Sequence, residues 1–198
     1  MPTTETPVKL RLWTVEEYHR MAEVGILQPE KPVELIAGQI IEKMSPQRSS
    51  HAAAITRTNR VLVNLLGEEI LIRLQLPVQL NDHSEPEPDI ALVRVDPLDY
   101  AAHHPTASDV YLIIEVADTT LKTDLQIKAK DYAQSGIVDY WVLNITSRQL
   151  HVFREPTQQG YQSEVILSED ESISPLQFPD CVVAICEILP PVIGLENT

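Results

Sequence analysis

Hydrophobic and polar positions follow a helical period in some segments of the chain and a strand period in others. The segment "TVEEYHRMAE" places Thr14 and Glu17 at the spacing of a capping box and predicts a helix over 15–23. The segment "VELIAGQIIEKM" predicts two strands joined by a turn at Ala37 and Gly38. In "SSHAAAITRTNRVLVNLL" the apolar residues recur near helical spacing until a glycine, so a longer helix is expected there.

Three strand-like runs follow this helix: "ILIRLQLPVQL", "PDIALVRV" and "VYLIIEVA". A helix is then expected over about 124–135, begun by a capping box of Thr123 and Gln126 and ended by Gly136, before the apolar strand "VDYWVLNI". The runs "QLHVFRE", "YQSEVIL" and "CVVAICEIL" are expected to be further short strands. The order helix, three strands, helix, strand predicts an α/β fold in which helices pack over a mixed central sheet.

Length and composition are those of one globular domain. The 198 residues are 43% hydrophobic, so we expect a single domain over 1–198 with a core at about 10–190. The chain has neither a run of 18 apolar residues nor an N-terminal signal peptide, which favours a cytoplasmic protein without membrane contact. Cys181 and Cys186 lie in an apolar run without a metal-binding spacing, so we expect buried free thiols.

The charge of the chain is strongly acidic and unevenly distributed. The formal net charge is −14, and residues 155–198 hold eight acidic residues and no Lys or Arg. Proteins that bind duplex DNA usually carry a basic surface. The composition therefore disfavours tight non-specific DNA binding, and the acidic C-terminal flank is expected to lie away from any path taken by phosphates.

Single carboxylates interrupt two of the apolar strands. Asp89 begins the strand "DIALV", and Glu115 lies within "LIIEVA". Because side chains alternate along a strand, the two carboxylates can meet on one face if these strands are neighbours. Carboxylates brought together in apolar surroundings repel each other unless a cation lies between them. Hard oxygen ligands of this kind suit Mg²⁺ or Mn²⁺.

The helix expected over 124–135 carries two lysines on different sides. At 100° per residue, Lys128 lies about 40° from Tyr132, inside the edge of the apolar stripe, whereas Lys130 points to solvent. Lys128 either reaches past the apolar face to water, pairs with Asp124 one turn earlier, or enters the carboxylate pair. In the last case it supplies a positive charge beside a metal-bound water, as metal-assisted phosphodiester hydrolysis requires.

The same segments, taken in order, resemble the restriction endonuclease family Uma-two, a branch of the PD-(D/E)XK nuclease superfamily. The resemblance rests on "PDIALV", "LIIEVAD", the spacing by fours of Asp124, Lys128 and Tyr132, and "GIVDYWVLN". Upstream, "VELIAGQIIEKMSP" and His51 match the usual first segment of the family, and the resemblance covers residues 10–190. It implies a restriction-endonuclease-like fold, with a mixed central sheet flanked by helices and extra N- and C-terminal strands.

The resemblance also implies roles for individual residues. Asp89 and Glu115 would be the metal carboxylates, and the backbone carbonyl of Val116 would be a third ligand. The lysine of the superfamily usually stands two residues after the glutamate, where this chain has Ala117. In this family the following helix is thought to supply the lysine, which implies Lys128.

Other positions allow more than one interpretation. Glu34 either orients a metal-bound water or lies on a solvated strand face. His51, at the start of a helix, is a proton carrier, a residue of the helix cap or a core histidine. The chain departs from the family at Asp118, where a small hydroxyl residue is usual, and at Asn144, where Asp is common. Neither departure removes an expected ligand.

The resulting expectation is a Mg²⁺- or Mn²⁺-dependent endonuclease that hydrolyses phosphodiester bonds in nucleic acid, with DNA as the substrate. A homodimer is expected by analogy with enzymes that cut one strand per subunit. Two other classes of function are compatible with the sequence. One is a nucleic-acid-binding or regulatory module that has lost turnover, which the acidic charge and Ala117 favour. The other is a structural protein in which Glu115 and Lys128 form a buried ion pair.

Overall fold

The computed structural model describes residues 10–43 and 48–192 of the chain. Its centre is a six-stranded sheet in the order β3-β4-β5-β6-β7-β8. The strands of this sheet are β3 (Ile70–Leu74), β4 (Ile90–Arg94), β5 (Val110–Ala117), β6 (Asp139–Asn144), β7 (Gln149–Thr157) and β8 (Gly160–Ser168). β5 and β6 are parallel, and the other neighbouring pairs are antiparallel. The mixed α/β sheet predicted from the order of elements is confirmed.

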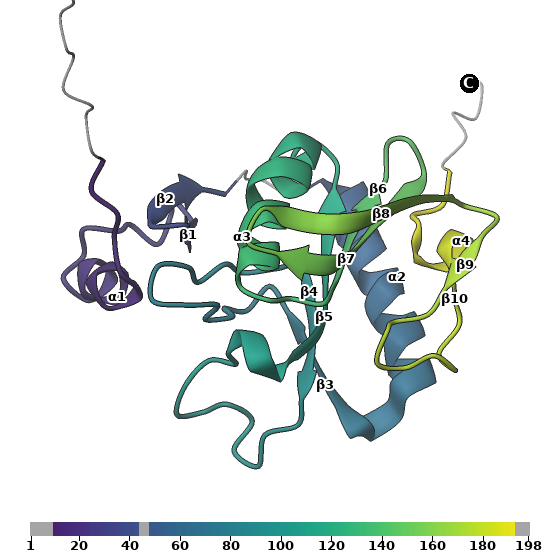
Figure 1. The fold of residues 1–198 in the computed structure, drawn as a ribbon, viewed down its shortest axis with the longest axis horizontal. Coiled ribbons are helices and arrows are strands. Elements are labelled where there is room, and N and C mark those ends of the chain that lie inside the picture. The colour runs from purple at the N-terminus through teal and green to yellow at the C-terminus, as the bar shows by residue number, and fades with distance from the viewer. Residues whose placement is uncertain (1–9, 44–47, 193–198) are drawn as a thin grey trace, which may run out of the picture.

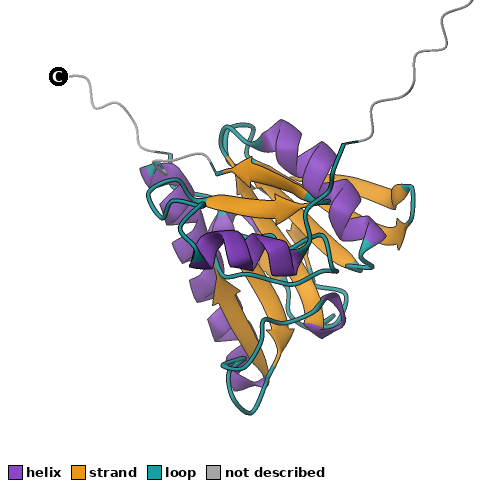
Figure 2. Ribbon diagram, turned by 90° about the vertical axis from the view of Figure 1, so that its left-hand side faces the viewer, coloured by secondary structure: helices purple, strands orange, loops and turns teal. Residues whose placement is uncertain are grey.

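Helices cover both faces of this sheet (Figure 2). The helical elements are α1 (Val15–Glu23), α2 (Ser49–Leu66), η1 (Gly67–Glu69), η2 (Ala107–Asp109), the π-helical η3 (Thr123–Lys128), α3 (Ala129–Gln134) and α4 (Ile185–Ile188). α2 and α4 pack on the face that buries Ile90 and Leu92 of β4, and α3 packs on the face that buries Ala91 and Val93. Alternate residues of β4 therefore pack into two hydrophobic cores, one on each face of the sheet. None of the described helices could span a membrane.

Short strands outside the central sheet form the extra N- and C-terminal pairs that were expected. They are β1 (Val33–Ile36) with β2 (Gln39–Glu42), and β9 (Ser172–Ile173) with β10 (Val183–Ala184). The β1–β2 hairpin lies with α1 beside the central sheet (Figure 1). Its turn requires Gly38, because φ is +74° and an added Cβ would meet Leu12 Cβ at 2.5 Å. Hydrogen bonds from Glu85 N to Leu35 O (2.8 Å) and from Gly38 N to His83 O (2.7 Å) attach the hairpin to the loop before β4.

The helix that carries Lys128 begins earlier than its sequence indicated. Helical structure starts at Leu121, and the predicted capping box of Thr123 and Gln126 is not formed. The backbone N–H of Asp124 donates to the carbonyl of Thr120 (3.1 Å), and Thr120 Oγ1 donates to Asp124 Oδ2 (2.6 Å). The predicted start was wrong, because helical hydrogen bonding already begins upstream of Thr123. The capping box of α1 is present as predicted.

Two apolar runs are less regular than predicted. The strand in "ILIRLQLPVQL" ends at Leu74, because Gln75 has a φ of +52° and turns the chain. In "CVVAICEIL" only Val183–Ala184 is extended, and the next residues form the helical turn α4. This turn exposes Cys186 while Cys181 stays buried, so the expectation of two buried thiols was wrong for Cys186.

Candidate active site

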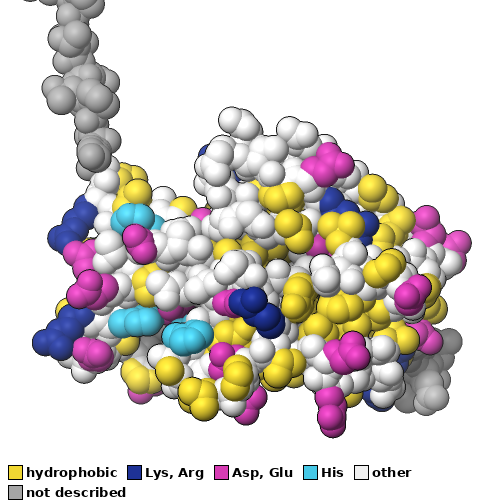
Figure 3. All heavy atoms as spheres, turned by 60° about the horizontal axis from the view of Figure 1, so that its bottom comes forward, with side chains coloured by type: hydrophobic (Ala, Val, Ile, Leu, Met, Phe, Trp, Pro, Cys, Tyr) yellow, Lys and Arg dark blue, Asp and Glu magenta, His cyan; other side chains and the backbone are white. Residues whose placement is uncertain are grey.

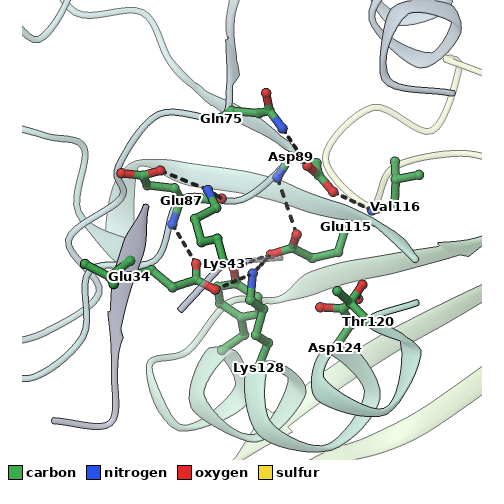
Figure 4. Close-up of polar contacts among 12 residues, drawn as sticks. Glu34, Lys43, Gln75, Glu87, Asp89, Glu115, Val116, Thr120, Asp124 and Lys128 are labelled. Carbon is green, nitrogen blue, oxygen red and sulfur yellow. Dashed lines mark hydrogen bonds and ion pairs between the residues drawn. The ribbon is translucent and has the colours of Figure 1, made fainter. Parts of the chain in front are cut away.

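Asp89 and Glu115 lie close together on the α3 side of the sheet, as strand alternation predicted (Figure 4). Asp89 immediately precedes β4, and its backbone N–H donates to Glu115 Oε2 on β5 (3.4 Å). His51 Nε2, from the first turn of α2, and Gln75 Nε2 both lie 3.1 Å from Asp89 Oδ1. Asp89 Oδ2 accepts a hydrogen bond from the backbone N–H of Val116 (2.9 Å). Three segments that are distant in sequence therefore converge on one carboxylate.

Lys128 reaches this pair from η3 and is buried. Its Nζ lies 3.0 Å from Glu115 Oε1 and 3.0 Å from Glu34 Oε1, so the ammonium bridges two carboxylates. Tyr132 OH donates a hydrogen bond to Glu115 Oε1 (2.8 Å). Lys130 is exposed, as the helical wheel predicted. Of the three arrangements open to Lys128, the structure shows the one in which it enters the carboxylate pair.

Glu34 lies inside the site, not on a solvated face. It is buried on β1, and its Oε2 accepts a hydrogen bond from the backbone N–H of Glu87 (3.2 Å). The hairpin therefore delivers a third carboxylate to the group around Lys128. The hydroxyl of Tyr132 and the position of Asp124 beside the site also agree with the helix face read from the sequence.

The pKa of Asp89 is lowered although the residue is almost fully buried. Burial acts to raise this pKa, but hydrogen bonding from His51, from the backbone N–H of Val116 and from the amide of Gln75 outweighs it. Burial likewise acts to lower the pKa of His51, and the hydrogen bond with Asp89 reverses the shift and raises it. Asp89 is thus held as a carboxylate beside a histidine that favours its protonated form.

The pKa values on the Lys128 side reflect burial and the shared ammonium. Burial raises the pKa of Glu115 to about 8, against the opposing attraction of Lys128. Burial also raises the pKa of Asp124 to about 6, again opposed by Lys128. For Lys128, burial acts to lower the pKa, but Glu115 and Glu34 raise it well above its usual value. Lys128 therefore stays protonated beside Glu115 and Asp124, whose pKa values are raised.

These groups lie in a cavity of about 450 Å³. Its walls come from the β1–β2 hairpin, the start of α2, the segments before β4 and the link between β5 and η3. No residue from 155–192 lines the cavity, in agreement with the expectation that the acidic flank lies elsewhere. The members of the expected flank after 192 lie outside the described residues.

The donor chemistry of the cavity fits a hard divalent cation. Asp89, Glu115 and Glu34 offer carboxylate oxygens, which Mg²⁺ and Mn²⁺ prefer. Within the described ranges, no group of three or more His, Cys, Asp or Glu side chains is already arranged as a metal site. Each carboxylate instead binds protein donors, so an ion would have to replace some of these bonds. Val116 contributes its N–H to Asp89.

Sequence reasoning did not find every polar group at the site. Gln75 was hidden in an apolar run, and its contact with Asp89 depends on the turn at the end of β3. Lys43 Nζ pairs with Glu87 Oε2 (2.9 Å) at the cavity wall. The only sequence signal for this pair was the position of Lys43 directly after the second strand of the hairpin.

Comparisons with known proteins agree with this architecture. A crystal structure of "a putative nuclease belonging to DUF820 from Anabaena variabilis ATCC 29413" matches with a TM-score of 0.71 and 19% sequence identity, over 88% of this chain and 96% of that one. At this identity the match shows a shared fold. No curated protein sequence matches the chain. The model of the Uma2 family, described as "Putative restriction endonuclease", matches residues 15–186. The chain belongs to the Uma2 family.

Proposed function

We propose that this protein is a Mg²⁺- or Mn²⁺-dependent endonuclease that hydrolyses phosphodiester bonds in DNA. The observation that carries the proposal is the meeting of Asp89, Glu115 and Lys128 on one face of the sheet, within a polar cavity. Membership of the Uma2 family supports the same reaction class. A buried lysine beside paired carboxylates is also expected where charge develops on a phosphate.

In this proposal each side chain has a distinct task. Asp89 and Glu115, with the carbonyl of Val116, hold the cation, which when bound lowers the pKa of a water and polarises a phosphoryl oxygen. Lys128 places its ammonium against the charge that develops on the attacking water or the phosphate. Glu34, bonded to Lys128, orients that ammonium and accepts a hydrogen bond from the attacking water.

Two neighbours hold the Asp89 carboxylate in position. His51 and Gln75 bind the same oxygen of Asp89, which leaves the rotation of that carboxylate little freedom. The raised pKa of His51 favours the protonated ring, so its second task is to relay a proton of the attacking water to the leaving oxygen.

The test is a cleavage assay on DNA and RNA with Mg²⁺, Mn²⁺ or EDTA. We expect metal-dependent cleavage that falls by at least about 100-fold in Asp89→Asn. The matched control is Lys130→Met on the exposed face of the same helix, which should cut like the parent. The proposal fails if pure parent protein cuts neither polymer with either metal, or if Asp89→Asn cuts as fast as the parent.

A second candidate is a nucleic-acid-binding module without turnover. It is favoured by the absence of a preassembled metal site among the described residues, whose carboxylates already bind protein donors. Such a module should retain labelled DNA with or without Mg²⁺ and leave it intact. Calorimetric titration of Mg²⁺ or Mn²⁺ into the parent and Asp89→Asn distinguishes the two candidates, since the nuclease requires a site that Asp89→Asn weakens.

A further inference from the structure

The reactive groups lie on the floor of the cavity and not on an open surface. Asp89 is 8% exposed, Lys128 is 7% exposed and Glu115 is 3% exposed. A phosphate must therefore descend between the walls before it can reach them. The depth of the site restricts which form of nucleic acid can enter.

Hydrogen bonds connect the hairpin wall to α3, the helix that directly follows Lys128. Ala37 N donates to Ser84 Oγ (2.8 Å), and Ser84 Oγ donates to Asp131 Oδ1 on α3 (3.0 Å). Lys43, at the end of the hairpin, pairs with Glu87 in the loop before β4. Because these bonds join the hairpin to both α3 and that loop, moving the wall outward breaks several of them at once.

The cavity has the volume of a pocket for one small ligand. Its 450 Å³ lies within the roughly 300–1,000 Å³ of such pockets. A flexible single strand can bend its backbone into a cavity of this size, whereas the backbone of an intact duplex is held in a stiff helix. The volume of the cavity therefore favours a single strand over an intact duplex.

The charges around the cavity also disfavour a duplex. Its lining contains seven Asp or Glu and three Lys or Arg. Lys43 and Lys128 are held by carboxylates, whereas the side chain of Arg48 is 67% exposed and its contact with Asp118 is long, at 3.5 Å. A lining with this balance of charge offers few of the phosphate contacts that duplex binding uses. Figure 3 shows one face of the molecule, on which Lys and Arg side chains lie in separate small groups between acidic ones.

None of the described residues that line the cavity is Phe, Tyr or Trp, and the ring of His51 is held against Asp89. Stacking platforms for bases, which many single-strand binders use, are therefore absent from the described part of the lining. The cavity can hold the sugar-phosphate backbone while the bases stay outside it. Cleavage should then depend little on base identity.

We propose that the substrate of this site is a single-stranded segment of nucleic acid that enters with one backbone phosphate past Arg48. This inference rests on the proposed nuclease function. In the reaction a water oxygen bonds to phosphorus and the bond from phosphorus to one ester oxygen breaks. The departing oxygen takes one proton of that water, which leaves a hydroxyl end and a phosphate monoester end.

The test uses one oligonucleotide sequence, labelled with fluorescein, as a single strand, a blunt duplex and a duplex with a single-stranded gap. Binding is measured by anisotropy with Ca²⁺, and cleavage is measured with Mg²⁺ and with Mn²⁺. Because unpairing costs a few kcal/mol, we expect the single strand and the gapped duplex to exceed the blunt duplex at least about tenfold in both measurements. Equal or better use of the blunt duplex overturns the inference.

Arg48→Met provides the variant at the mouth of the cavity, and Lys130→Met provides its control with the same loss of charge. We expect Arg48→Met to weaken single-strand binding about tenfold through loss of one charged phosphate contact, with Lys130→Met unchanged. Equal weakening in both variants means that only net charge matters, and it overturns the assigned route past Arg48.

The outcomes for the inference and for the proposed function are separable. If the protein binds the single strand preferentially but cleaves nothing with either metal, the single-strand inference is supported and the nuclease function is refuted. If it cleaves the blunt duplex preferentially, the nuclease function is supported and the single-strand inference is refuted. If it binds none of the three forms, both are refuted.

Discussion

Replacing Lys128 by methionine removes one positive charge from between two buried carboxylates. Methionine keeps most of the apolar stem, so packing against the sheet is largely retained. The ammonium lies 3.0 Å from both Glu34 and Glu115, and removing one partner of a buried ion pair costs about 3–5 kcal/mol. Because two carboxylates lose the same cation, we expect a loss near the upper end of this range.

Protonation should relieve part of this loss in acid. Burial raises the pKa of Glu115 to about 8 in the parent protein, and loss of Lys128 removes an opposing influence. Parent and variant both lose stability as the pH rises from the usual pKa of a glutamate to about 8, because the folded state of each binds more protons than its unfolded state. Above pH 8 the parent ionises Glu115 beside Lys128, whereas the variant retains the proton. The deficit in the free energy of unfolding of Lys128→Met should therefore grow as the pH rises above 8.

Urea unfolding at pH 8.5 and pH 6, followed by the fluorescence of the buried Trp141, measures both effects. With a slope of about 2 kcal/mol per M, the midpoint should drop by roughly 1.5–2.5 M at pH 8.5 and by less at pH 6. Lys130→Met should stay within about 0.5 kcal/mol of the parent. Adding Glu34→Gln to Lys128→Met should restore part of the stability, because one uncompensated carboxylate is removed.

A loss below about 1 kcal/mol at pH 8.5 would refute this reasoning, since that is the scale of an exposed pair. The same variant tests the role in cleavage. We expect its cleavage rate to fall by about 100-fold or more under conditions in which it remains folded. Cleavage at the parental rate would show that another group stabilises the charge on the phosphate.

Two further substitutions test the surroundings of the site by urea unfolding and the cleavage assay. Asp139→Asn should lower the free energy of unfolding by about 2–4 kcal/mol, because Asp139 is fully buried and accepts hydrogen bonds from Arg154, Trp141 and the backbone N–H of Leu176. Cleavage per folded molecule should not change. An unchanged free energy of unfolding would contradict the importance of these bonds. Tyr132→Phe removes only the hydroxyl that donates to Glu115, so it should cost about 1–2 kcal/mol; a gain in stability would show that this bond is dispensable.

Local patterns in the sequence were sufficient for the order of elements and for the faces of the main strands. The capping box of α1, the length of α2 and the alternation in β4 and β5 depend on residues close together in the chain, and they were predicted correctly. The exposure of Lys130 and the burial of Lys128 followed from the helical period. These features are predictable because hydrogen bonding and side-chain direction within one element are set by near neighbours.

Element ends were less predictable than the elements themselves. The helix expected to begin at Thr123 begins upstream, where the carbonyl of Thr120 accepts a hydrogen bond from Asp124 N–H, and "CVVAICEIL" forms a helical turn after two extended residues. Intrinsic preference is a weak guide to the residue at which an element begins or ends.

The carboxylates Asp89 and Glu115 and the lysine were identifiable from the chain alone, because charged residues stand out in strands that are otherwise buried. Their mutual distances, the entry of Glu34 and the contact of Gln75 with Asp89 depend on pairings between segments far apart in sequence. The pKa values of these groups depend on the same pairings. Burial and charge act through space. The three-dimensional fold therefore decided which charged groups lie beside each carboxylate, and so whether its pKa is raised or lowered.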